Sequence, residues 1–176
     1  MKKTFGIISI ILVLLLLTGC TLKNETKENY TVFDYIKKLS TKDDLKTINK
    51  VMGFEGELIN NSTSFKIYKW VINENKNETV QAIFYKDSTS ISITFSDQDI
   101  KSSKVDFSKY EEIKESINNK EKLKYKDIKS KFKVNGVLVE KTSTETKYRW
   151  VNENSKYVNA TFNNKTGYCT MISGMI

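Results

Sequence analysis

The sequence predicts an α+β fold: two tandem units, each with two helices followed by four strands, whose antiparallel sheets lie side by side with the helices on one face. The first observation is a repeated motif, because Tyr68-Lys69-Trp70-Val71 returns as Tyr148-Arg149-Trp150-Val151. The second is that the surrounding residues repeat in the same order, with the glycine and leucine at the same distances from the tryptophan. These matches are Gly56 and Leu58 with Gly136 and Leu138, Asn73-Glu74-Asn75 with Asn152-Glu153-Asn154, and Val80, Ala82 and Phe84 with Val158, Ala160 and Phe162. The third is that the apolar period changes in each copy from helical spacing to alternation.

The first unit is expected over residues 31–97. Thr31 to Asp34 has the capping-box pattern, so a helix is predicted over about residues 32–39. A second box, Thr41 to Asp44, predicts another helix, which ends at Gly53. Short runs in which apolar residues recur at every second position, separated by polar turns, then predict an antiparallel meander. Its strands are expected near residues 57–60, 65–72, 79–85 and 90–95.

The second unit is expected over residues 108–176, after a polar linker over 98–107. Its first helix begins at a third capping box, Ser108 to Glu111, and its second lies within 125–132. Strands are then expected near residues 137–140, 146–151, 157–162 and 168–172. The order of predicted elements therefore matches the first unit throughout.

Comparison of the two copies separates the faces of the sheet, because side chains alternate across a strand. The face whose residues repeat carries Trp70 and Trp150 and is expected to pack on the helices. The alternative is that the two tryptophans are exposed and anchor a binding partner. Cys169 falls on the same inner face and is expected to be a buried apolar residue rather than a reactive thiol. The other face varies and is expected to be open. It carries Phe65, Ile67, Lys69, Ile83 and Tyr85 in the first unit, and Glu145, Lys147, Arg149, Tyr157, Asn159 and Thr161 in the second.

The N-terminus has the pattern of an exported lipoprotein. A basic start precedes an apolar run over residues 5–17, too short for a comfortable membrane span, which predicts a signal peptide over residues 1–19. Leu17, Thr18, Gly19 and Cys20 resemble the bacterial lipobox, which implies a lipid anchor with acyl chains such as palmitate on Cys20. The alternative is an ordinary signal peptide with an incidental cysteine. The polar residues 20–30 are expected to tether the domain outside the cell membrane.

Composition excludes most enzymatic chemistry. The chain of 176 residues has no histidine, the usual general base near neutral pH and the commonest metal ligand. The paired acids Asp43-Asp44 and Glu111-Glu112 fall in predicted first turns, where they complement the helix dipole. Asp97-Gln98-Asp99 lacks the glycine and final glutamate of a calcium loop. We therefore expect no enzyme, metal or cofactor.

Nucleic acid is not an expected partner either. The formal net charge is +8, but the lysines are spread among acids and form no compact basic run. This pattern favours a solvated surface.

Two units with glycine and leucine on the first strand, Tyr-x-Trp on the second and Val-x-Ala-x-Phe on the third resemble the beta-lactamase inhibitory protein (BLIP) family and the BLIP-like lipoproteins of Gram-positive bacteria. The resemblance covers residues 33–173. It implies two sheets side by side, forming a concave eight-stranded surface that binds a partner protein. In the inhibitor, an aspartate and a phenylalanine on loops enter the enzyme. The corresponding hairpins here, Asn73 to Asn77 and Asn152 to Lys156, contain neither, so the fold is carried over without the inhibitory activity.

The leading hypothesis is a non-enzymatic, lipid-anchored protein of the outer cell surface that binds a protein or an anionic envelope component through the open sheet face. The alternatives are an inhibitor or modulator of a cell-wall or beta-lactamase-type enzyme, a hydrolase based on Asp or Glu, and a structural spacer. The sequence leaves the partner and the oligomeric state open. The expected partner-binding residues are Lys69, Ile83, Tyr85, Lys147, Arg149, Tyr157 and Asn159.

Overall fold

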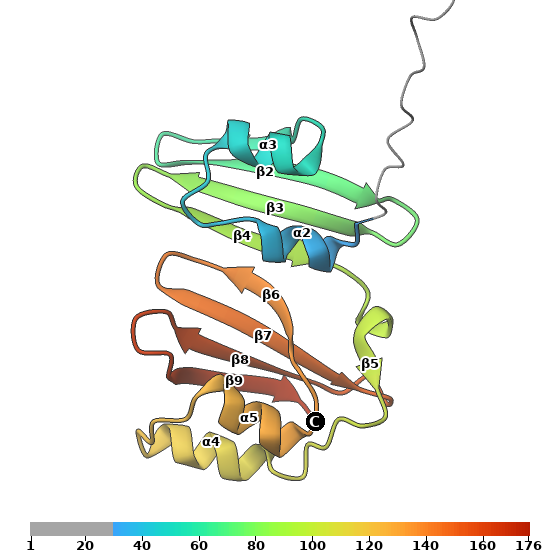
Figure 1. Cartoon of the computed structure of the whole chain (residues 1–176), viewed down its shortest axis with the longest axis vertical. Coiled ribbons are helices and arrows are strands. Elements are labelled where there is room, and N and C mark those ends of the chain that lie inside the picture. The colour runs from blue at the N-terminus through green and yellow to red at the C-terminus, as the bar shows by residue number, and fades with distance from the viewer. Residues whose placement is uncertain (1–29) are drawn as a thin grey trace, which may run out of the picture.

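The structure is a computed structural model that describes residues 30–176, and it has a mixed α+β fold dominated by one large sheet (Figure 1). The expected signal peptide, the lipobox and Cys20 lie outside the described residues. The helices are α2 (Val32–Lys38), α3 (Leu45–Met52), α4 (Tyr110–Asn118) and α5 (Tyr125–Phe132), with a 3₁₀ turn η1 (Asp97–Ile100). The strands are β1 (Glu57–Asn61), β2 (Phe65–Asn73), β3 (Glu78–Tyr85), β4 (Thr89–Thr94), β5 (Lys101–Ser102), β6 (Val137–Lys141), β7 (Glu145–Asn152), β8 (Tyr157–Asn163) and β9 (Cys169–Met175).

The sheet is continuous across the two halves of the chain. Its strands follow the order β1-β2-β3-β4-β6-β7-β8-β9, and neighbours in this path are antiparallel. The halves meet where β4 pairs β6 through Ile91↔Lys141 and Ser92↔Glu140, which we call the seam. The two sheets expected side by side are in fact one: hydrogen bonds between β4 and β6 join the halves, and β5 adds a ninth strand to the eight expected.

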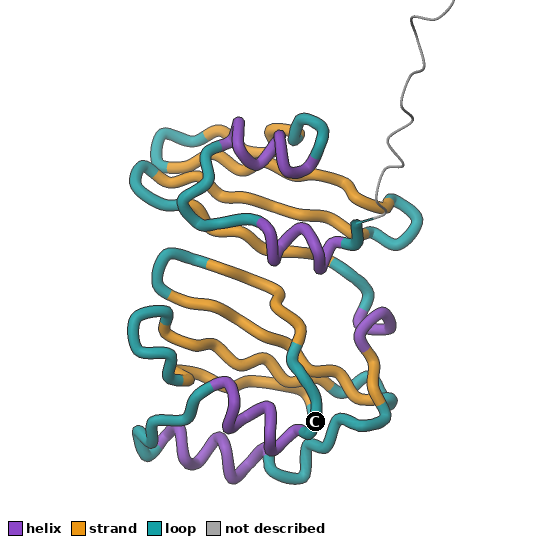
Figure 2. Tube along the Cα trace, viewed as in Figure 1, coloured by secondary structure: helices purple, strands orange, loops and turns teal. Residues whose placement is uncertain are grey.

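The four α-helices of residues 30–176 lie on one side of the sheet (Figures 1 and 2). α2 and α3 cover a core built on Trp70, while α4 and α5 cover a second core built on Trp150. Both indoles are buried, at 0% and 1% exposure, so the prediction that the repeated face is internal is confirmed. Leu138 of β6 packs against the first core, which extends that core across the seam.

The repeated glycines lie directly against the repeated tryptophans. A Cβ added to Gly56 would lie 2.5 Å from Trp70 Cε2, and one added to Gly136 would lie 2.5 Å from Trp150 Cζ2. Only a residue without a side chain lets the backbone approach the indole so closely. The spacing from glycine to tryptophan in the sequence is thus a packing requirement.

One of the three predicted capping boxes is present. Asp34 accepts hydrogen bonds from both the backbone N–H and the hydroxyl of Thr31, at 3.0 and 2.6 Å. The box expected at Thr41 is wrong, because Asp44 itself caps α3 by accepting from the N–H of Thr47 at 2.7 Å. The box expected at Ser108 is wrong as well, because the Ser108 N–H donates to Asp106 Oδ1, and α4 begins at Tyr110 with Lys109 as its N-cap.

The segment expected to be a plain linker is structured. It forms η1 and then β5, which pairs in parallel with the end of β7 through Lys101↔Val151 and Ser102↔Asn152. β6 begins at Val137, opposite Arg149, and β5 pairs with the same side of β7 beyond that point, at Val151 and Asn152. Val105 is buried in the second core. These contacts attach the segment to the second half of the chain.

Candidate functional site

The side of the sheet opposite the helices, which we call the open face, has an apolar first half. On β2 and β3, Phe65 pairs directly with Tyr85 and Ile67 with Ile83. These four residues form the apolar quartet. They are half-buried except Tyr85, which is 47% exposed, and the rings of Phe65 and Tyr85 lie 6.1 Å apart.

Polar residues surround the apolar quartet. Ser90 of β4 lies opposite Ile83, and Asn60 of β1 lies opposite Ile67. Lys69 follows Ile67 on the same face and is half-buried, and within residues 30–176 no carboxylate lies at ion-pair distance from its ammonium. An apolar centre with a polar rim is the usual anatomy of a protein–protein interface.

The second half of the open face has a different character, because its charges are neutralised within the chain. Arg149 donates from Nε to Asn159 Oδ1 at 2.9 Å and from Nη1 to Asp97 Oδ1 at 3.0 Å. Its guanidinium also lies 5.0 Å from the ring centre of Tyr157 and 5.8 Å from that of Phe95. The structure thus brings the predicted site residues Tyr157 and Asn159 against a third, Arg149, whose guanidinium they and Asp97 hold in place.

Lys147, the other predicted basic site residue of this half, is also paired. Its ammonium forms an ion pair with Glu140 of the neighbouring β6, and each side chain is about one-third exposed. The expectation that Lys147 and Arg149 are exposed cations is therefore wrong. A charge reversal at either position would disturb internal contacts as well as any external one.

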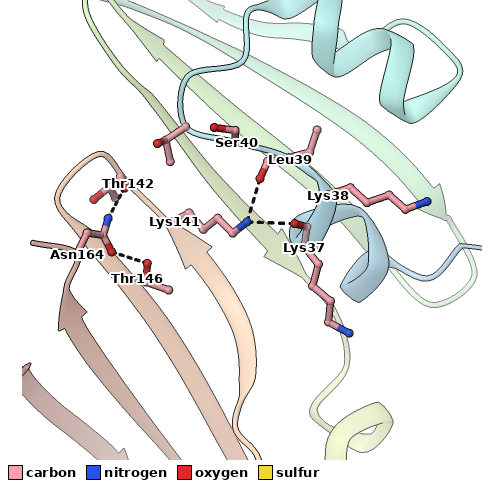
Figure 3. Close-up of a pocket in the computed structure, with 9 residues that line it drawn as sticks. Lys37, Lys38, Leu39, Ser40, Lys141, Thr142, Thr146 and Asn164 are labelled. Atoms are coloured by element: carbon pink, nitrogen blue, oxygen red, sulfur yellow. Dashed lines mark hydrogen bonds between the residues drawn. The ribbon is translucent and has the colours of Figure 1, made fainter. Parts of the chain in front are cut away.

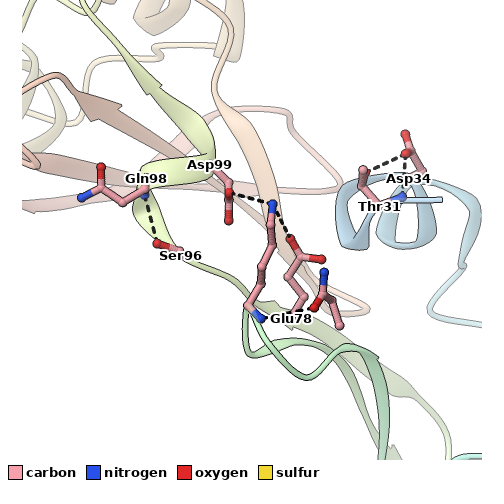
Figure 4. A network of polar contacts seen from close by, with 8 residues as sticks. Thr31, Asp34, Glu78, Ser96, Gln98 and Asp99 are labelled. Carbon is pink, nitrogen blue, oxygen red and sulfur yellow. Dashed lines mark hydrogen bonds and ion pairs between the residues drawn. The ribbon is translucent and has the colours of Figure 1, made fainter. Parts of the chain in front are cut away.

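η1 connects the two halves through its two aspartates. Asp97 holds Arg149 of β7, and Asp99 accepts from the ammonium of Lys76 in the β2–β3 turn at 3.3 Å (Figure 4). The same ammonium lies 4.0 Å from Glu78, a buried carboxylate. The two acids of Asp97-Gln98-Asp99 are thus occupied by cations of the chain itself, one from each half.

A polar pocket of about 410 Å³ lies beside the seam on the helix side of the sheet (Figure 3). Lys141 of β6 reaches across it and donates to the C-terminal carbonyls of α2, at 2.9 Å to Leu39 and 3.5 Å to Lys37. Burial lowers the pKa of Lys141, while Asp43 opposes the shift. The side chains of the other two lysines point in different directions. The Lys38 ammonium lies over the Tyr30 ring, and the Lys37 ammonium lies 4.0 Å from the Asp34 carboxylate.

These contacts show that the lysines of the pocket do not converge on one point. Three cations around a pocket suggest an anion site, but each is occupied by a partner within the chain. The pocket is therefore a weaker candidate site than the apolar quartet.

Chemistry based on thiols or metals finds little support in the described part of the chain. Cys169 is buried, and desolvation raises the pKa of its thiol to about 11, so little thiolate forms near neutral pH. Between residues 30 and 176 no group of three or more Cys, Asp and Glu is placed to hold a metal ion.

Comparison with known proteins finds no matching family model, no matching curated protein and no matching solved structure. Over residues 30–176, no helix has the length and apolar character needed to cross a membrane.

Two members of the apolar quartet, Phe65 and Ile67, are missing from the expected binding residues. Both alternate in register with Lys69, so strand periodicity alone contains the signal that would have added them. The role of Asp97 has no comparable signal, since Asp97 lies 52 residues from its partner Arg149.

Proposed function

We propose that this protein is a non-enzymatic, lipid-anchored binding protein of the outer cell surface that docks a partner protein on the first half of its open face. The observation that carries the proposal is the apolar quartet, two cross-strand apolar pairs on a side of the sheet that the described helices do not cover. Anchoring through Cys20 supplies the location and is part of the proposal.

A protein fits this surface better than an anionic envelope polymer. A protein that docks on Phe65, Ile67, Ile83 and Tyr85 removes their apolar area from water. Each Å² of apolar area buried in this way stabilises the complex by roughly 25 cal/mol. A polyanion would need free cations, yet Lys147 and Arg149 are paired with Glu140 and Asp97. Lys69 remains to pair with an acidic side chain at the edge of the interface.

The proposal includes the tandem architecture expected from the sequence. The first two strands of each half have the same register, with Leu58↔Tyr68 matched by Leu138↔Tyr148, and a bulge follows at the same place in both. This agreement supports one unit used twice and is consistent with a BLIP-like fold. Modulation of a cell-wall enzyme is one form that binding of a partner protein could take.

The test is site-specific photo-crosslinking in the full-length chain within its native membrane. A benzophenone amino acid replaces Tyr85 on the open face or, as the control, Lys46 on the opposite side of the sheet in α3. We expect a crosslinked protein from position 85 alone, and we expect Ile83→Lys to remove it.

Equal crosslinking from both positions would contradict the proposal. So would persistence of the crosslink after Ile83→Lys in a chain whose circular dichroism is unchanged. Binding to a purified anionic polymer that survives Ile83→Lys, with no protein adduct, would favour an envelope polymer instead.

A further inference from the structure

β9 is an edge strand without the charged residues or proline that commonly prevent pairing with another chain. It ends the sheet and, in the described chain, pairs along its length only with β8. Residues 167–176 contain no Asp, Glu, Lys or Arg and no proline. Charged residues and proline are the common devices that prevent an exposed edge from pairing.

The chain covers this edge only in part: α4 packs against β9 from the helix side, and loop residues pair with its start. The N–H of Cys169 donates to the carbonyl of Leu123 at 2.7 Å, and Tyr168 forms a bridge with Lys124. A register shift with β8 lies between Cys169 and Met171, and beyond it β9 keeps a regular register from Met171 to Met175. Met171 and Met175 are 52% and 62% exposed.

The opposite edge of the sheet is different. β1 contains the charged residue Glu57, and a bulge interrupts its register between Leu58 and Asn60. A bulge breaks the row of outward backbone groups that a new strand would need. Of the two edge strands, β9 therefore has the longer uncharged segment in regular register that could pair with another strand.

We propose that β9 pairs antiparallel with β9 of a second copy of this chain, about a two-fold axis at Ser173. The segment from Met171 to Met175 is complementary to itself in this arrangement. Met171 lies opposite Met175 of the second copy on the open face, and the same contact forms again across the axis. On the helix side, Ile172 lies opposite Gly174, which has no side chain to obstruct it.

This arrangement has the two-fold symmetry of most homodimers, in which the same residues of each copy form the interface. The resulting sheet runs without interruption from β1 of one copy to β1 of the other. The apolar quartet lies on β2 and β3, far along the strand order from β9, so dimer formation leaves the proposed docking surface accessible.

The test uses a cysteine at the proposed axis of the full-length chain in bacterial membranes. Residues that face each other in antiparallel strands have Cα atoms about 5.5 Å apart in a hydrogen-bonded pair and about 4.5 Å apart in a non-hydrogen-bonded pair. Both distances suit a disulfide. Ser173→Cys should therefore crosslink to twice the monomer mass on mild oxidation with copper phenanthroline, and the band should disappear on reduction.

Ser143→Cys, in the exposed β6–β7 turn, is the matched control, and the wild-type chain reports any contribution of Cys20 and Cys169. Adding Met171→Lys to the Ser173→Cys chain should suppress the dimer, because it places an ammonium against a methionine at two points of the interface.

Three outcomes would overturn the inference: no dimer from Ser173→Cys, equal crosslinking from Ser143→Cys, or a dimer that Met171→Lys leaves unchanged. An adduct of another mass would show that a different protein occupies the edge. None of these outcomes tests the apolar quartet, which the crosslinking from position 85 examines separately.

Discussion

At the scale of single residues, the repeated motif is explained by contacts rather than by function. Each tryptophan needs a glycine against its ring and an acceptor for its indole N–H. Asn49 accepts from Trp70 Nε1 at 3.1 Å, whereas Trp150 Nε1 donates to the carbonyl of Val134 at 3.0 Å. The ring and the glycine repeat, but the acceptor does not. The packing constraint is therefore the stricter one.

Gly56→Ala and Gly136→Ala should each lower the free energy of unfolding by about 1–3 kcal/mol, because the new methyl group overlaps an indole ring. Urea denaturation followed by tryptophan fluorescence measures the loss. Trp70→Phe provides the control, since the smaller ring makes room for the methyl. Gly56→Ala should cost less in that background, and an unchanged cost would mean that the contact is not the cause.

At the scale of elements, the helix pair α4–α5 is joined by a carboxylate on one helix and an ammonium on the other. Lys131 of α5 and then Lys109 lower the pKa of Glu112 from 4.5 to about 2. A carboxylate with a lowered pKa in the folded state stabilises the fold above its unfolded pKa. That contribution is lost as the pH falls from about 4.5 towards 2.

Glu112→Gln should therefore make stability less dependent on pH between about 4.5 and 2, with the remaining acids unaffected. The measurement is the urea midpoint across this range, compared with Glu115→Gln on the same helix as the control. A Glu112→Gln chain with the same acid sensitivity as the wild type would show that the ion pairs contribute nothing to stability, as is common for exposed pairs.

The elements were predictable from the sequence where the signal was local. Periodicity and turns placed the helices and the main strands within a few residues, because each signal lies inside the element it describes. β9 extends three residues beyond its expected end at Ile172. The η1 contacts were not predictable, because Asp97 and Asp99 acquire their partners only when distant strands meet.

The candidate site was predictable only in part for the same reason. Strand alternation placed Lys69, Ile83 and Tyr85 on the open face, and the structure agrees. It also placed Arg149 there, but alternation cannot show that Asn159 and Asp97 already hold a guanidinium. Strand alternation thus shows on which face a charged side chain lies, but not whether that side chain is free to bind a partner.

At the scale of the whole molecule, the seam decides whether the two halves behave as one unit. The pairing of β4 with β6 is short, and three other contacts support it: Leu138 in the first core, the η1 ion pairs, and Lys141 on the carbonyls of α2. Lys141 is the only one of these that joins a strand of the second half directly to a helix of the first through hydrogen bonds among residues 30–176.

Lys141→Met keeps most of the length of the side chain but leaves the Leu39 carbonyl without its donor, which should cost about 1–3 kcal/mol. Because the loss lies at the seam, amide hydrogen exchange should accelerate first at Ile91, Ser92 and Glu140, before the tryptophan cores open. Lys129→Met, on the exposed side of α5, is the control. Uniform acceleration across both cores would mean that the halves unfold as a single cooperative unit, with no weak point where β4 meets β6.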